Sequence, residues 1–141
     1  MRFLFLFALL GLFACGDDAA DAAAEAAIAA NPNAYCLRGE VTTAGADPAA
    51  ATVELNLFLV TATTIYGTYN HLPVVGDSIH GKISGRLAGD TLRLNYLALT
   101  EAAESTSFDL LLAGREARLL QPDTLLQIPP TLRRIACPRR D

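Results

Sequence analysis

From Tyr35 onward, apolar residues recur at every second position, and this alternation constrains the fold more than any other feature of the chain. Residues 78–87 show it most clearly, because polar residues there are interleaved with a series of apolar or bare positions: Ile79, Gly81, Ile83, Gly85 and Leu87. Side chains of a strand point alternately to the two faces of a sheet, so this period predicts strands with one buried and one solvated face.

Seven further segments show the same period and are predicted as strands: residues 35–43, 53–59, 65–69, 91–100, 106–113, 117–121 and 125–128. Short turns join them, such as Ala88-Gly89-Asp90, and Pro129-Pro130 is expected to end the strand pairing because proline has no backbone N–H. About eight antiparallel strands without a convincing helix predict an all-β meander. Closing it into a small up-and-down barrel hides both sheet edges, and a β-sandwich is the alternative.

The chain begins with a short apolar run that resembles a secretion signal. Arg2 supplies a positive start, and residues 3–14 carry no charge, but this run is well short of the roughly 20 residues of a spanning helix. The run ends in Leu12-Phe13-Ala14-Cys15, which resembles the lipobox of bacterial lipoproteins, although Phe13 departs from the usual small or aliphatic residue. The resemblance implies removal of residues 1–14 and acylation of Cys15, which then anchors the protein in a membrane. A plain secretory signal, with an ordinary thiol at Cys15, is the alternative.

Residues 15–33 are predicted to form a tether between this anchor and a single β domain of residues 34–141. The segment is mostly alanine with scattered acids, has no apolar stripe, and ends at Asn31-Pro32-Asn33, so it is expected to be disordered or weakly helical. The acids directly after Cys15 resemble the export signals of Bacteroidetes surface lipoproteins. The expected location is the cell envelope, with the outer membrane favoured and surface display as a further hypothesis.

The three cysteines divide into one anchor and one pair. With Cys15 assigned to lipid, Cys36 and Cys137 remain as an even pair in an oxidising compartment, and neither has a CxxC neighbour or a nearby histidine. We predict a disulfide between them. It would close a loop of about 100 residues, for which chain entropy gives about 4.7 kcal/mol.

The charge balance is mildly acidic, with a formal net charge of −4 for the whole chain. This argues against a nucleic acid partner, which needs concentrated lysine and arginine. Basic residues crowd the C-terminus: Arg133, Arg134, Arg139 and Arg140. We interpret them as a solvated tail, with a contact to anionic lipid or to an acidic partner as the alternative.

The central part of the domain, residues 67–108, resembles a group of uncharacterised lipoproteins found mostly in Bacteroidetes. The resemblance rests on a set of strand and turn motifs: Gly67-Thr68-Tyr69, residues 81–85, residues 89–92, Tyr96, Thr100-Glu101-Ala102 and Phe108. Those proteins also have a cysteine near the start of the domain, here Cys36, and a Cys-Pro near its end, here Cys137-Pro138. The resemblance implies a β fold and an envelope location, and no activity.

Three groups of polar residues are candidates for chemistry. His71, Asp77 and His80 could ligate a divalent metal, but no third firm ligand is evident, so surface histidines and no metal site are expected. Glu101 and Glu104 lie on a predicted turn near Asp109 and are expected to be hydrated rather than a catalytic pair. The remaining candidates lack a nucleophile-elbow context: Ser84, Ser105 and Ser107. No enzyme and no cofactor is predicted.

The tyrosines give the remaining candidate site. Tyr69 and Tyr96 share the apolar face of their strands, where core packing is the default. The alternative is a cavity in which Tyr66, Tyr69 and Tyr96 orient a small apolar ligand. The sequence thus predicts a non-enzymatic, lipid-anchored envelope protein that binds a small apolar ligand or another envelope protein. An inhibitor or accessory subunit of an extracytoplasmic enzyme, using residues 70–77, is the alternative.

Overall fold

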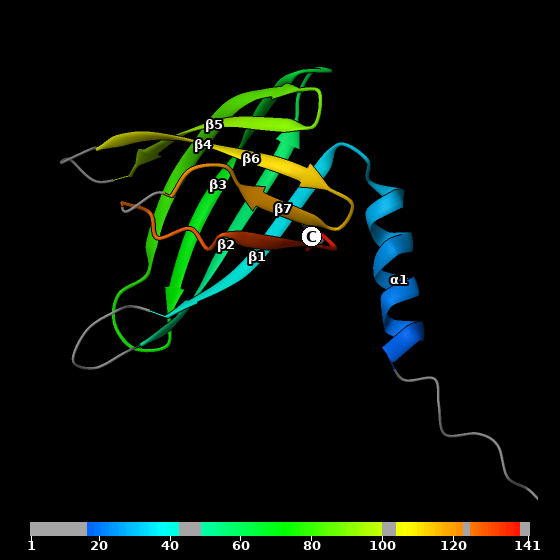
Figure 1. Ribbon diagram of the computed structural model, residues 1–141, viewed down its shortest axis with the longest axis horizontal. Coiled ribbons are helices and arrows are strands. Elements are labelled where there is room, and N and C mark those ends of the chain that lie inside the picture. The colour runs from blue at the N-terminus through cyan, green and yellow to red at the C-terminus, as the bar shows by residue number, and fades with distance from the viewer. Residues whose placement is uncertain (1–16, 43–48, 100–103, 123–124, 139–141) are drawn as a thin grey trace, which may run out of the picture.

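The chain forms a closed eight-stranded barrel preceded by one helix (Figure 1). The computed structural model describes residues 17–42, 49–99, 104–122 and 125–138. The elements are α1 (Asp17–Ala30), β1 (Ala34–Thr42), β2 (Ala50–Leu59), β3 (Thr64–Pro73), β4 (Ile79–Ala88), β5 (Thr91–Ala98), β6 (Ser105–Ala113), β7 (Glu116–Leu119) and β8 (Thr131–Ile135). Consecutive strands pair antiparallel, and β8 pairs with β1. The predicted all-β up-and-down barrel is confirmed, and the closed strand order excludes the β-sandwich.

The inward positions of the strands form one apolar core. On β2, for example, Val53, Leu55 and Leu57 are fully buried, whereas the residues between them are partly exposed. Two glycines allow neighbouring strands to approach closely. A Cβ at Gly67 would lie 2.0 Å from the backbone oxygen of Asn56, and a Cβ at Gly85 equally close to that of Arg93. These positions therefore permit the strong coiling that a small barrel requires.

The eighth strand lies later in the chain than the sequence indicates. Residues 125–128 are predicted as a strand, but they pair with no strand, and β8 begins only after the two prolines. Gln127 has φ = 54°, in the left-handed region, which does not continue a strand. Leu126 and Ile128 are nevertheless buried in the core. The alternation correctly marks the inward side chains, but it does not reveal that their backbone lies outside the ladder.

We call residues 125–130 the plug segment, because they fill the wall where the last strands are too short. β7 has four residues and β8 five, while β1 and β6 have nine each. Pro129 packs where a side chain on β1 would otherwise stand, since a Cβ at Gly39 would lie 2.5 Å from the Cγ atom of Pro129. Beyond the short ladders of β7 and β8, the wall is therefore completed by the apolar packing of this segment.

The seam between β1 and β8 is short and covalently reinforced. Its register contains three residue pairs, against nine between β1 and β2. The predicted disulfide is confirmed: Cys36 on β1 is bonded to Cys137, two residues after β8, with the Cα atoms 5.2 Å apart. The bond ties the first strand to the segment after β8, beside this short ladder.

Helix α1 contacts the barrel through charged side chains. Asp21 accepts from Arg133 (3.2 Å) and Arg115 (3.4 Å), and Figure 1 shows the helix beside the barrel. The tether is thus helical over most of its length, and Asp21 joins it to the barrel by ion pairs. No helix in the described part of the chain is long and apolar enough to cross a membrane.

The interpretation of the basic C-terminus as a solvated tail is wrong for its first two members. Arg133 and Arg134 belong to β8. The guanidinium carbon of Arg134 lies 4.4 Å from the ring centre of Tyr35, and its Nη2 atom donates to the carbonyl of Ala34. Arg133 thus contacts the acid Asp21, and Arg134 contacts an aromatic ring and a backbone carbonyl, because β8 places them next to α1 and β1. Arg139 and Arg140 lie outside the described residues.

Candidate functional site

A cavity of about 390 Å³ opens at one end of the barrel, where β3 and β5 end and β4 and β6 begin. Its lining comes from these strand ends and from the plug segment: Tyr69, His71, Ile79, Tyr96, Ala98, Glu104, Leu125, Leu126 and Gln127. The volume falls within the range of small-molecule sites. The chain passes from α1 into β1 at the opposite end of the barrel, where Ala34 pairs with Phe58. The pocket therefore faces away from the helix.

Two tyrosines form the inner wall of the pocket. The rings of Tyr69 and Tyr96 meet edge to face, with centroids 5.2 Å apart. The Tyr69 hydroxyl donates to the carbonyl oxygen of Leu126 at 2.5 Å, so β3 holds the plug segment across the barrel. Gly81 makes room for the second ring, because a Cβ there would lie 2.0 Å from an atom of the Tyr96 ring. The tyrosine pair thus fixes both the depth of the pocket and the position of the wall that the plug segment provides.

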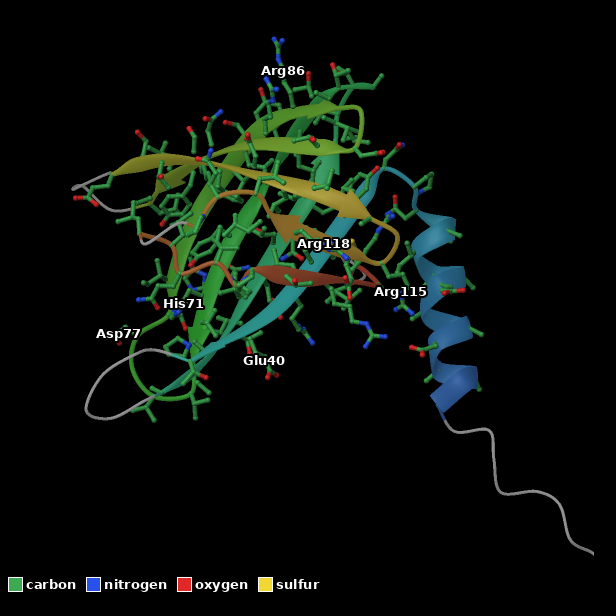
Figure 2. The ribbon with its side chains drawn as sticks, viewed as in Figure 1. Glu40, His71, Asp77, Arg86, Arg115 and Arg118 are labelled. Atoms are coloured by element: carbon green, nitrogen blue, oxygen red, sulfur yellow. A yellow bond between two sulfur atoms is a disulfide. The ribbon has the colours of Figure 1, made fainter. Side chains whose placement is uncertain are left out.

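His71 is the buried polar residue of the pocket. It follows Tyr69 on the inward face of β3, opposite Val53 and Ile79, and only 8% of its surface is exposed. Neither ring nitrogen has a hydrogen-bond partner among the described residues. Burying such a group without a partner costs about 1–3 kcal/mol, and most buried polar groups in folded proteins do have a hydrogen-bond partner. The side chain, labelled in Figure 2, lies near the end of β3.

Burial also affects Tyr96. Desolvation raises the pKa of its hydroxyl above the ordinary value of 10.0. The neutral hydroxyl is therefore the form that the folded protein favours, and it can donate a hydrogen bond throughout the physiological range.

We expect this burial to weaken the fold in alkali. Because the folded-state pKa is raised, Tyr96 contributes stability that is fully present below its unfolded pKa and is lost as the pH rises through the folded pKa. Tyr96→Phe should remove this part of the alkaline loss, which amounts to at most about 1.4 kcal/mol per pH unit. Urea denaturation between about pH 8 and pH 11 measures it. The control is Tyr66→Phe on the exposed face, and an unchanged slope in Tyr96→Phe would contradict the assignment.

Exposed apolar side chains gather at the end of the barrel where the pocket opens. Most of the large exposed hydrophobic residues belong to the strand ends and loops at this end: Val74, Val75, Ile79, Leu97, Leu99 and Leu125. Val74 and Val75, in the turn between β3 and β4, are 78% and 79% exposed. Apolar surface gathered at an opening is typical of a site that receives an apolar ligand or a partner.

The structure separates the three tyrosines proposed as ligand contacts. Tyr69 and Tyr96 share the inner face that the alternation predicts, where both pack in the core and also line the pocket. Tyr66 does not join them, because it occupies an outward position of β3 and is 54% exposed. The prediction that all three share one cavity is therefore wrong for Tyr66.

The histidine candidates also separate. The expectation of a surface histidine holds for His80, which is exposed, with Nδ1 2.7 Å from Oδ1 of Asn70. It is wrong for His71, because β3 continues through Pro73 and so carries this residue inside the barrel. Asp77 is exposed in the following turn. Within the described ranges, no three His, Cys, Asp or Glu residues form a group that could hold a metal ion.

Among the described residues, the carboxylates and serines considered for catalysis do not lie together in one site. Glu104 lies at the rim of the pocket, whereas Asp109 lies further along β6 and pairs with Arg93 across the ladder. Glu101 and Cys15 lie outside the described residues. The serines lie on β4 and β6, where their side chains do not line the pocket: Ser84, Ser105 and Ser107.

Sequence reasoning missed two contributors, His71 and the plug segment. A signal for the first was available, since His71 continues the series Ile65, Gly67 and Tyr69 at a spacing of two. The alternation over residues 125–128 indicates that Leu126 is buried, but it does not predict that the segment lines the pocket, because its place depends on the lengths of β7 and β8. Comparison with protein-family models finds no match, and comparisons with curated proteins and with solved structures likewise find none.

Proposed function

We propose that this protein is a lipid-anchored, non-enzymatic protein of the cell envelope whose barrel binds a small, mainly apolar ligand in the end pocket. The observation that carries the proposal is His71, a buried imidazole without a partner among the described residues, which lines an otherwise largely apolar cavity. A few polar groups in an apolar pocket are the usual means of orienting a ligand. Tyr96 is the second such group.

The anchor half of the proposal rests on the sequence. The apolar run before Cys15 and the Leu-Phe-Ala-Cys motif support lipidation, and two or more acyl chains hold a protein firmly in a membrane. Mass spectrometry of the N-terminal peptide should find Cys15 acylated and residues 1–14 removed. The outer membrane is the favoured location.

A second candidate is recognition of another envelope protein, including inhibition of an extracytoplasmic enzyme. The turn between β3 and β4 supports it, because Val74 and Val75 project almost fully into solvent. Substituting both valines with serine would abolish such an interaction without affecting the pocket lining. Ligand binding is the better supported function, since it also explains His71.

The test measures both the stability and the ligand binding of one variant. If His71 serves a ligand rather than the fold, His71→Leu should raise the free energy of unfolding by about 1–3 kcal/mol, because it removes an unpaired buried polar group. The affinity of the same variant for small apolar probes should differ from that of the wild type, as measured by NMR of the Ile79 and Leu126 methyl groups. His80→Leu, on the exposed face, should change stability by no more than about 0.5 kcal/mol. Loss of stability in His71→Leu, or pocket resonances that respond to no probe, would contradict the proposal.

A further inference from the structure

The charges around the pocket are acidic. Glu104 is the one residue with a formal charge among the described lining residues. The sequence has no lysine or arginine at the positions that supply the lining, and the nearest one along β4 is Lys82. Lys82 alternates with the inward Gly81 and Ile83 and is exposed on the outer face. In Figure 2, Asp77 and His71 lie toward the same end of the barrel, whereas Arg86 projects at the opposite end.

The polar groups of the pocket can pair with a ligand that donates hydrogen bonds. An imidazole in its neutral form has one N–H and one nitrogen lone pair, so His71 can accept a hydrogen bond in the buried part of the site as well as donate one. Glu104, at the rim, adds a carboxylate. The rings of Tyr69 and Tyr96 present aromatic surface, which attracts cations placed over a ring face.

An anionic ligand could accept hydrogen bonds from His71 and Tyr96, but the charge of the site would disfavour it. The described lining offers it no positive side chain, and Glu104 would repel it. From this charge distribution and the unpartnered His71, we infer that the ligand is a protonated organic amine on an apolar body. The inference rests on the proposed function and specifies the chemical class of its ligand. The ammonium group donates to His71 and faces Glu104, while the apolar body packs against Ile79 and Leu126.

The experiment compares three eight-carbon probes that share one body: octylamine, octanol and octanoate. The full-length protein is held in phosphatidylcholine nanodiscs, and binding is followed by NMR of the Ile79 and Leu126 methyl groups. Octylamine should bind about tenfold or more tightly than octanoate, because the Glu104 carboxylate attracts the ammonium group and repels a carboxylate. The three probes partition differently into the bilayer, so each affinity is calculated from the free probe concentration measured with empty nanodiscs.

Two variants and one control show whether the preference for the amine arises in the pocket. Glu104→Gln should reduce the preference for octylamine over octanol by about two- to fivefold, as expected of an exposed ion pair. His71→Leu should reduce it by about tenfold or more. His80→Leu, matched in residue type but outside the barrel, should leave the preference unchanged.

The outcomes distinguish the two proposals. If octanol or octanoate binds at the pocket as tightly as octylamine, the amine inference is overturned and the ligand-binding function stands. If no probe shifts the pocket resonances, both are overturned. An amine preference that survives both Glu104→Gln and His71→Leu would also overturn the inference, because it would then arise elsewhere.

Discussion

Replacing Cys36 and Cys137 together with alanine should lower the free energy of unfolding by about 4 kcal/mol. The bond joins residues separated by 101 positions in sequence, and closing a loop of that size removes about 4.7 kcal/mol of chain entropy from the unfolded state. The three-residue seam between β1 and β8 offers little to compensate for its loss. Urea denaturation followed by circular dichroism measures the change, which for a domain of this size is a large share of the total stability.

The single variants provide the control for this experiment. Cys36→Ala and Cys137→Ala each abolish the same bond, so each should cost nearly as much as the double variant. Reduction of the wild type should reproduce the loss. A double variant within about 1 kcal/mol of the wild type would show that the wall holds without the covalent tie.

Tyr69→Ala should lower the free energy of unfolding by about 3–5 kcal/mol, the range found for removing a buried aromatic side chain. Tyr69 is 1% exposed, packs against Tyr96, and holds the plug segment through Leu126. Its substitution therefore opens a cavity and also removes the hydrogen bond to the plug segment. Thermal and urea denaturation measure the loss.

Tyr66 provides a matched control on the same strand. It precedes Tyr69 on β3, lies on the outer face, and is 54% exposed. Tyr66→Ala should change stability by no more than about 1 kcal/mol, the span of strand propensity. Equal losses in the two variants would contradict the assignment of Tyr69 to the interior.

Much of the barrel was predictable, because one face of each strand is buried. Because of that asymmetry, apolar residues recur at every second position of the sequence. This period places Tyr69 and Tyr96 on the same face of the sheet. The same alternation places Tyr66 outside, so its inclusion as a ligand contact could have been rejected from the sequence. The predicted strand ends at residue 69 because turn residues follow soon after it, whereas β3 continues through Pro73 and places His71 inside the barrel.

Other features depend on distances that a sequence does not contain. Residues 125–128 alternate as a strand does, yet alternation requires only an extended chain with one buried side. Whether the backbone joins a ladder is decided by its neighbours, and here β7 ends too early to pair with it. Likewise, Asp21 meets Arg115 across 94 residues and Arg133 across 112, a contact that only the closed barrel creates.

The order in which the strands pair has a consequence for how the protein reaches its native state. Every pairing in the described barrel joins consecutive strands except that of β1 with β8. Hairpins can therefore form as the chain emerges, whereas closure must wait for the last strand and overcome the entropy of a long loop. Closure also brings the two thiols within bonding distance. The bond between Cys36 and Cys137 then holds the first and last strands together, so that reopening the barrel requires more than the loss of three residue pairs.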